Sequence, residues 1–341
     1  MTRKLGIILN HLIKELITYY FSEANVSIDA VPFGLTNYSK VITINNEKYI
    51  ARIYDEHTKD LEKLKFEIEL TTFLERQSLS FKVPEFLIAN TGGKYVELSN
   101  GKFGSVMNFI KGEIPDLTRI SDIKEYGRVV SELSVAFKLF KSDVHNQNIK
   151  FYDVYNLHPK SNEKSINHFL NDMPFEIENS HLSILKKSIQ DVQRIESITE
   201  GLPKQIIHHD ILVFNLLIDS QTRKMNGVLD FDFASYDIRA LELAICINHI
   251  FQHSNSSFVS LELFLDAYSQ YMTLTIEEIN NIPMLMKMYY VALICIYIGQ
   301  YYSGVKIDEY FRVILNQLII RTQWIEMNEE ALIECIKIKL T

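Results

Sequence analysis

Cysteine is scarce in this chain of 341 residues, which has three cysteines far apart in the sequence. Cys246, Cys295 and Cys335 each stand in an apolar stretch of helical periodicity, so we interpret them as reduced packing residues. A disulfide framework or a zinc site built on cysteine is therefore not expected. Reduced cysteines are typical of cytoplasmic proteins, and we predict a cytoplasmic location.

Long apolar runs are also missing. The longest one, residues 288–298, falls well short of the roughly 18 residues that a membrane-spanning helix needs. The amino-terminal stretch begins with positive charge, but its apolar run is interrupted within a few residues, so it makes a poor signal peptide. We predict no membrane anchor.

Positive charge is in short supply as well. The chain has 35 basic and 43 acidic residues and a formal net charge of −8. This balance argues against nucleic acid as the main partner and mildly favours a cationic small molecule. With 47% apolar residues and no internal repeat, low-complexity tract or obvious flexible linker, the chain is long enough for two lobes.

Two common kinds of catalytic site have little support. A zinc site at residues 208–210 would need further ligands, but no second cluster of His, Cys or Glu stands at a recognisable spacing. A serine or cysteine nucleophile is also unsupported, because no Gly-x-Ser-x-Gly motif occurs and the cysteines lack an electropositive setting.

The most informative stretch is residues 206–234. Two short apolar runs, residues 216–218 and 228–229, are separated by a polar segment at residues 220–227, which predicts two strands and a turn. Asp210, Asn215 and Asp230 would then converge at the strand ends.

These three side chains suit phosphoryl transfer, which needs a carboxylate for the attacking hydroxyl and hard oxygen ligands for Mg²⁺. Asp210 is the candidate base. Asn215 follows as a neutral oxygen ligand and Asp230 as a charged metal ligand, while His208 would brace the loop.

The spacing His208-x-Asp210-x-x-x-x-Asn215, followed by Asp230-Phe-Asp232, resembles the catalytic loop and metal motif of the aminoglycoside phosphotransferase and choline kinase family. Residues 227–244 are similar to the branch with type II homoserine kinase-like proteins and bacterial antibiotic kinases. The sequence departs from this family at two positions. His209 stands where the family usually has glycine, and Glu242 stands where aspartate is commoner.

The resemblance implies an α+β, bilobal, protein-kinase-like fold. We expect residues 1–107 to form a small, β-rich, nucleotide-binding N-lobe with an amino-terminal helix and one inserted helix. Residues 108–341 would form a large, mostly helical C-lobe with the catalytic loop, the metal motif and the acceptor pocket. Apolar periodicity predicts helices at 5–21, 59–76, 123–140, 181–199, 240–249, 258–272, 276–302 and 307–339.

The chain passes quickly from Asp232 into a helix and has no Ala-Pro-Glu sequence after it. This leaves too little room for the activation segment of a protein kinase. The implied acceptor is therefore a small molecule.

In the N-lobe, an Asn45-Asn46 turn predicts a hairpin, which in the resembling family lies over the nucleotide phosphates; an ordinary hairpin turn remains an alternative. Arg52 takes the place of the family's phosphate-contacting lysine. Its ion-pair partner would be Glu67, with Glu69 as the alternative, and the backbone of residues 107–110 would read the nucleotide base. The predicted nucleotide contacts are Gly34, Thr36, Asn37, Arg52, Glu67, Met107, Phe109 and Ile110.

The phosphoryl donor would be ATP with Mg²⁺, and GTP stays open. Asp232 could be a second metal-site carboxylate, and the acidity of this region suits an amine-bearing alcohol. An antibiotic of the aminoglycoside or amicoumacin kind is narrowly favoured over homoserine or an aminoalcohol.

The residues predicted to contact the acceptor come from several segments, and Asp237 with Arg239 could instead be a local structural pair. These residues are Asp237, Arg239, Tyr152 and Tyr301. An alternative of another class is a binding protein that keeps the kinase fold without catalysis. The presence of Asp210, Asn215 and Asp230 argues against it, whereas Arg52 is its only support.

Overall fold

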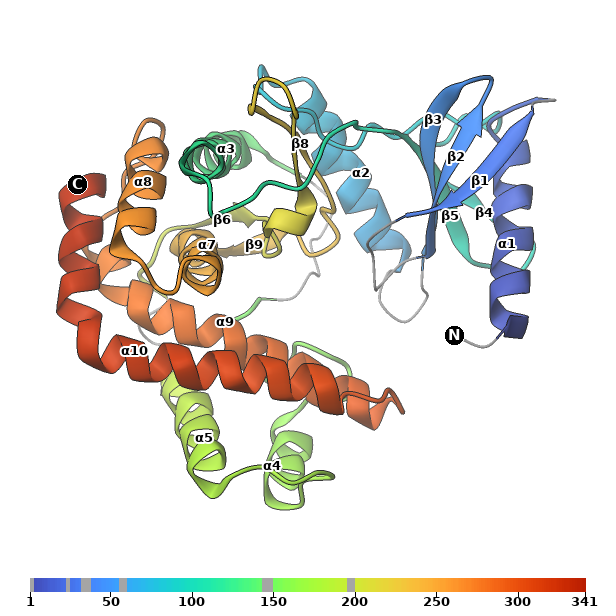
Figure 1. Ribbon diagram of the computed structural model, residues 1–341. Coiled ribbons are helices and arrows are strands. Elements are labelled where there is room, and N and C mark those ends of the chain that lie inside the picture. Colours follow the sequence, from blue (N-terminus) through green and yellow to red (C-terminus); the bar gives the residue numbers. More distant parts are fainter. Residues whose placement is uncertain (1–2, 23–24, 32–37, 55–59, 143–149, 195–199) are drawn as a thin grey trace. The chain divides into compact units, whose positions relative to one another are not determined.

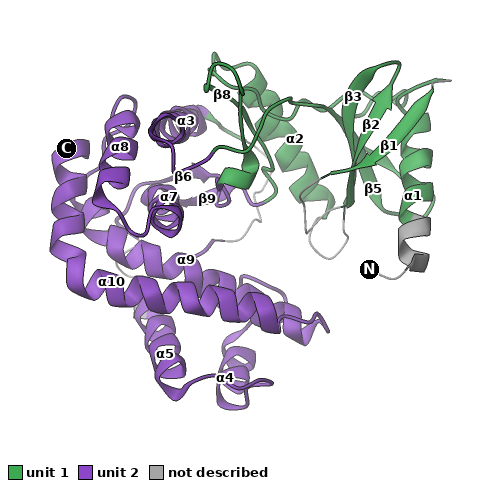
Figure 2. Cartoon of the chain, viewed as in Figure 1, with its two compact units in different colours: residues 1–115, 140–147, 213–232 green, residues 116–139, 148–212, 233–341 purple. Residues whose placement is uncertain are grey.

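The computed structural model describes residues 3–22, 25–31, 38–54, 60–142, 150–194 and 200–341 (Figure 1). The chain divides into two compact units (Figure 2). Unit 1 comprises residues 1–115, 140–147 and 213–232, and unit 2 comprises residues 116–139, 148–212 and 233–341. This grouping assigns residues 213–232 to unit 1, whereas the sequence placed them in the C-lobe; the lobe boundary at residues 107 and 108 stays a prediction.

Unit 1 contains an antiparallel five-stranded sheet in the order β1-β2-β3-β5-β4. Asn45 and Asn46, between β2 and β3, have φ values of 49° and 69°, as a tight two-residue hairpin turn requires, so the predicted turn is confirmed. The strands are β1 (Val26–Ala30), β2 (Tyr38–Ile44), β3 (Glu47–Ile53), β4 (Val96–Glu97) and β5 (Phe103–Asn108).

Helix α1 (Arg3–Thr18) packs its apolar side on this sheet. Leu12, Ile13 and Leu16 are buried against β2, β3 and β5. The approach is close at Gly104 on β5, where a Cβ atom would lie 2.9 Å from Leu16 Cδ1. A side chain at residue 104 would therefore require the Leu16 side chain to shift.

Helix α2 (Leu61–Glu75) begins at Asp60, whose side chain accepts the N–H of Lys63 at 2.9 Å. Such a cap satisfies one of the first N–H groups of the helix. The buried side of α2 carries Leu64, Leu70 and Glu67, of which Glu67 is the one charged residue. A buried glutamate needs a partner, and α2 presents it within unit 1.

The predicted hairpin of residues 216–229 is present as β7 (Leu216–Ile218) and β8 (Met225–Val228), after a short 3-10 helix at Val213–Asn215. The turn is shorter than predicted, because β8 begins at Met225. Asp219 closes it by accepting the N–H groups of Gln221 and Thr222 at 3.1 and 2.7 Å.

Where the structure describes it, unit 2 consists of helices, connecting loops and two short antiparallel strands, β6 (Lys204–Ile207) and β9 (Ser235–Ile238). Gly127 on α3 lets α8 approach closely, since a Cβ there would lie within 2.2 Å of the carbonyl oxygen of Phe264. The helices are α3 (Ile120–Leu139), α4 (Glu163–Asn171), α5 (Asn179–Arg194), α7 (Arg239–His253), α8 (Phe258–Tyr268), α9 (Ile276–Tyr302) and α10 (Asp308–Leu340).

Helices α9 and α10 run alongside each other in unit 2 (Figure 1). Within the described ranges, α9 alone is long and apolar enough to cross a membrane by length and composition. However, 72% of its most apolar window is buried inside the protein. A core helix passes the same test, so α9 is weak support for a membrane span.

Candidate active site

Unit 1 holds a cluster of one cation and three carboxylates around Arg52 on β3. Arg52 Nη1 lies 3.5 Å from Asp230 Oδ1, 3.7 Å from Glu67 Oε1 and 3.8 Å from Asp232 Oδ1. Its Nε donates to Ser39 Oγ at 3.3 Å, across the β2–β3 ladder. The guanidinium thus joins the sheet, α2 and the segment after β8.

The glutamate beside Arg52 is Glu67, the first of the two that the sequence left open. Glu69 accepts instead from Ser142 Oγ at 2.6 Å. Burial by itself lowers the pKa of Arg52, but the charges of Asp230, Asp232 and Glu67 outweigh it and the pKa is raised. The cluster keeps more negative than positive charge, as a site for a divalent cation requires.

The β7–β8 hairpin brings Asn215 and Asp230 to one end of the ladder. Leu216 pairs with Val228, and the N–H of Leu229 donates to the carbonyl oxygen of Asn215 at 2.8 Å. Asp230 follows with a φ of 62°, a conformation that few residues other than glycine adopt. Asn215 and Asp230 therefore come close together in unit 1, as predicted, whereas the predicted convergence of Asp210 with them stays a prediction.

In unit 2, the loop after β6 carries Asp210 between buried neighbours. His208 is buried; its N–H donates to Glu242 Oε2 at 2.5 Å, and its Nδ1 accepts the N–H of Asp210 at 3.3 Å. Tyr126 Oη donates to the carbonyl oxygen of Ile211 at 2.7 Å. The backbone is held on both sides of Asp210, which is itself only half-buried.

Glu242 is the carboxylate that receives this loop. It is 4% exposed, and burial raises its pKa to about 7 against the opposing hydrogen bond from the His208 N–H. The family's commoner aspartate has a shorter side chain. The longer glutamate reaches His208 from the first turn of α7.

His209 and Asp237 form a buried pair that sequence reasoning did not predict. His209 Nε2 lies 2.9 Å from Asp237 Oδ2, and both side chains are fully buried. The only sequence signal was the replacement of the family's usual glycine by His209. Asp237 was predicted to contact the acceptor, with a pair with Arg239 as the alternative. It accepts hydrogen bonds from His209 and from two backbone N–H groups, those of Phe151 and Ile238.

The other predicted acceptor residues have protein partners in unit 2. Arg239 Nε donates to Glu278 Oε1 at 2.8 Å, so its ion-pair partner is on α9. Lys204 Nζ lies 5.2 Å from the ring centroid of Tyr152. The ring of Tyr301 packs on Phe169, with centroids 5.3 Å apart. Contact of these residues with an acceptor stays a prediction.

Aromatic side chains lie near Asp210 in unit 2. Burial raises the pKa of Tyr289 and of Tyr297, and the charge of Asp210 raises both further. The ring of Tyr289 stacks on Phe151, with centroids 6.2 Å apart. These tyrosines come from α9, and they give Asp210 an aromatic flank.

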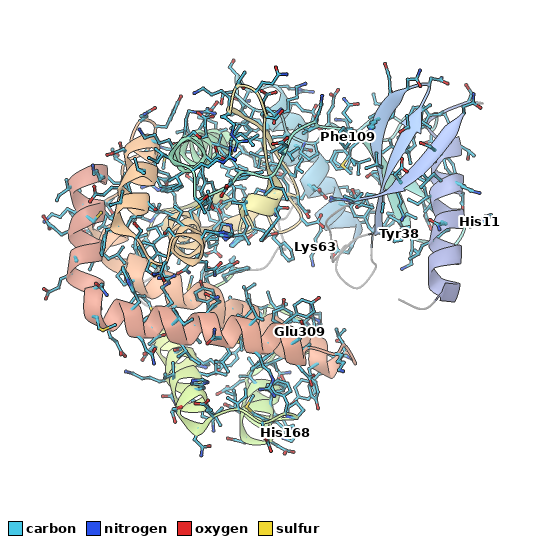
Figure 3. All side chains as sticks on the ribbon, viewed as in Figure 1. His11, Tyr38, Lys63, Phe109, His168 and Glu309 are labelled. Carbon is cyan, nitrogen blue, oxygen red and sulfur yellow. The ribbon has the colours of Figure 1, made fainter. Side chains whose placement is uncertain are left out.

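The segment predicted to read the nucleotide base begins at the end of β5. Met107 is buried and pairs with Ile50, whereas Phe109 is exposed with Lys48 Nζ 5.6 Å from its ring centroid (Figure 3). Ile110 is half-buried. The predicted phosphate contacts Gly34, Thr36 and Asn37 lie outside the described residues.

The side chains of the candidate site determine which metal ion it could hold. Within the ranges that the structure describes, no group of three or more His, Cys, Asp or Glu side chains could hold a metal ion by itself. Magnesium bound with a nucleotide needs only one or two carboxylates, because phosphates and water supply the other ligands. Asp230 and Asn215 suit that kind of site, whereas a zinc site gains no support.

Comparison with known proteins gives a consistent result. Residues 27–272 match the profile of the phosphotransferase enzyme family. A homoserine kinase of Methylobacillus flagellatus is 25% identical over 258 residues, which cover 74% of this chain and 73% of that protein.

Two solved structures share the fold. A microcompartment-associated aminopropanol kinase has a TM-score of 0.69 at 14% identity and covers 95% of this chain and 98% of its own. An amicoumacin kinase in complex with AMP-PNP, Ca²⁺ and Ami has a TM-score of 0.66 at 12% identity and covers 93% of each chain. The predicted family resemblance and the α+β, protein-kinase-like fold are confirmed.

Proposed function

The chain belongs to the phosphotransferase enzyme family and is a phosphotransferase with an alcohol group as acceptor; we propose that it transfers the γ-phosphoryl group of ATP directly to a hydroxyl of an amine-bearing small molecule. The observation that carries this proposal is the cluster of Arg52 with Glu67, Asp230 and Asp232. It combines a cation for phosphate with spare carboxylate charge for a metal ion.

Each residue has a distinct role in this proposal. Asp210 orients the acceptor hydroxyl and takes its proton, while His208 braces the loop from which Asp210 projects. Arg52, steadied by Glu67, contacts the phosphates, and Asn215 and Asp230 would hold Mg²⁺. When bound, Mg²⁺ supplies positive charge that offsets the charge of the phosphate oxygens during transfer.

The nucleotide-side contacts complete the proposal. The backbone at Met107, Phe109 and Ile110 would read the base, and the loop with Gly34, Thr36 and Asn37 would cover the phosphates. Asp232 supplies additional negative charge beside Arg52, which a second metal ion could use. We expect the enzyme to act in the cytoplasm.

The acceptor is proposed as an aminoglycoside-like or amicoumacin-like antibiotic, which matches an overall charge of −8. Homoserine is the second candidate. The observation that favours homoserine is the sequence likeness to a homoserine kinase, which extends over three-quarters of both proteins.

A panel assay tests the function. ATP consumption would be measured in the presence of Mg²⁺ with amine-containing antibiotics, homoserine, 1-amino-2-propanol, choline and ethanolamine, and the product identified by mass. Phosphorylation of one class would establish the acceptor, with Asp210→Asn as the inactive control. Binding of Mg-ATP without turnover on any member would favour a catalytically inactive binding protein.

A further inference from the structure

The backbone at His209 adopts a conformation that usually belongs to glycine. Among the described residues, seven other than glycine have positive φ, and five of these lie in surface turns: Asn45, Asn46, Arg223, Asn255 and Ser256. The other two, His209 with φ 64° and Asp230 with φ 62°, adjoin or form the candidate site. A β-carbon in this region is unfavourable unless its surroundings compensate for it.

The side chain of His209 provides such compensation. Its Nε2 lies 2.9 Å from Asp237 Oδ2, and its Nδ1 lies 3.1 Å from the carbonyl oxygen of Phe233. Ser235 Oγ is 3.3 Å from the same Nδ1. Both ring nitrogens are therefore engaged in a fully buried setting, so the ring and the backbone that carries it have one favoured orientation.

Asp237 extends this arrangement to a second segment. Its Oδ2 also accepts the N–H of Phe151 at 2.7 Å. The Phe151 ring in turn lies on the imidazole of His209, with centroids 4.4 Å apart, and stacks on Tyr289. The buried carboxylate of Asp237 thus links the loop before Asp210 to Phe151. The Phe151 ring extends this link to Tyr289 on α9.

We propose that His209 and Asp237 are positioning residues for phosphoryl transfer. The pair holds the left-handed turn that sets the direction of Asp210, and Asp237 fixes the segment at Phe151, next to the predicted acceptor residue Tyr152. This inference rests on the proposed role of Asp210 as the base. It assigns Asp237 a role through His209 instead of direct contact with the acceptor.

The pair should affect the acceptor side and leave the nucleotide side unchanged. The nucleotide-side candidates Arg52 and Glu67 belong to unit 1 and make their ion pair within it. A misdirected base lowers kcat, and a loosened Phe151 segment raises KM for the acceptor. KM for Mg-ATP should stay within about twofold, because neither change removes a group that binds phosphate.

Three variants test the proposal: Asp237→Asn, His209→Ala and His209→Gly. Asp237→Asn should lower kcat about 10- to 100-fold, the range expected when a reacting group is displaced by about 1 Å. His209→Ala loses the hydrogen bonds of the imidazole ring but keeps a β-carbon in the unfavourable backbone conformation. His209→Gly loses the hydrogen bonds and the β-carbon together. His209→Gly should therefore lose less activity than His209→Ala, a difference that a general packing role does not predict.

Hydrogen exchange measured by mass spectrometry adds a readout that needs no acceptor. Amide exchange in peptides spanning residues 206–212 and 150–156 should quicken in Asp237→Asn, with exchange in β2 and β3 unchanged. The proposal is wrong if Asp237→Asn lowers only the melting temperature, with kcat per folded molecule and loop exchange as in the parent. Unimpaired turnover in Asp210→Asn would instead refute the proposed function, whatever the Asp237 variants do.

Discussion

The cluster around Arg52 in unit 1 and the loop around Asp210 in unit 2 are held in opposite ways. The ion pairs of Arg52 span 3.5 to 3.8 Å, and Asp230 keeps 25% of its side chain exposed. By contrast, the loop is fixed by hydrogen bonds from 2.5 to 3.3 Å through buried groups. Long ion pairs that include a partly exposed carboxylate, here Asp230, can exchange partners with a ligand, whereas short buried hydrogen bonds keep one geometry.

This difference matches the two tasks of phosphoryl transfer. Groups that bind phosphate and metal must give up their partners in the protein when the nucleotide arrives. Strong ion pairs among these groups would therefore weaken nucleotide binding. A catalytic base has to point in one direction before the acceptor arrives. The Arg52 cluster should therefore depend on charge, and the loop around Asp210 on geometry.

The largest effect is expected for Asp210→Asn. The amide cannot accept the acceptor proton, and general base catalysis is worth about 10²- to 10⁴-fold, so kcat should fall by about 10³-fold. Binding of Mg-ATP, measured by calorimetry, should remain nearly unchanged, because Asp210 does not hold the nucleotide. Equal losses in turnover and nucleotide affinity would mean that Asp210 belongs to the metal site.

The variant Glu242→Gln tests the buried carboxylate that holds the Asp210 loop, through the pH dependence of protein stability. The pKa of Glu242 is raised to about 7, so between pH 4.5 and 7 the folded protein holds a proton that the unfolded chain releases. Stability from this group is complete below pH 4.5 and is lost as pH rises through about 7, by about 3 kcal/mol.

Glutamine cannot titrate, yet its carbonyl oxygen can still accept the N–H of His208. The melting temperature of Glu242→Gln should therefore decline less between pH 5 and pH 8 than that of the parent. Glu242→Asp is the control for titration, because it keeps an acidic group at this residue, although the shorter side chain lies farther from His208. Parallel declines in Glu242→Gln and the parent would show that Glu242 does not carry this pH dependence.

Asp230→Ala should weaken Mg-ATP binding by roughly 10- to 100-fold, since a charged ligand contributes more than water to a magnesium site. Asp232→Ala is the comparison, because Asp232 also lies beside Arg52 but is proposed only as a supporting charge. Titration calorimetry at fixed Mg²⁺ would measure both. A larger loss in Asp232→Ala would reverse the assignment of the two carboxylates.

The sequence predicted what depends on local patterns. Apolar periodicity located the helices other than α4, which was not predicted, and the Asn45-Asn46 pair identified the hairpin turn. Sequence patterns did not predict β1, because this edge strand is mostly exposed and has no alternation of buried and exposed residues. They also missed the partner of His209, since Asp237 lies 28 residues away and hydrogen-bond partners leave no periodic signal.

The same limit applies to Arg52. The family resemblance implied its phosphate contact, and its partner was predicted as Glu67 with Glu69 as the alternative. Excluding Glu69 depended on which side of α2 faces Arg52, a question of three-dimensional packing. Residue spacing predicts which groups are near in the chain, but side-chain direction in the folded unit decides which of them meet.

Arg52→Lys is expected to have the smallest effect and tests the comparison most directly. Lysine restores the residue usual in the resembling family and keeps the charge, but it cannot donate to Ser39 while it reaches Glu67. If charge is what this region supplies, KM for Mg-ATP should rise less than about tenfold, whereas uncharged Arg52→Met should lose at least about 100-fold in kcat/KM. If Arg52→Lys lost as much as Arg52→Met in steady-state assays, the Arg52 cluster would depend on hydrogen-bond geometry as strictly as the loop around Asp210, and the contrast between the two regions would disappear.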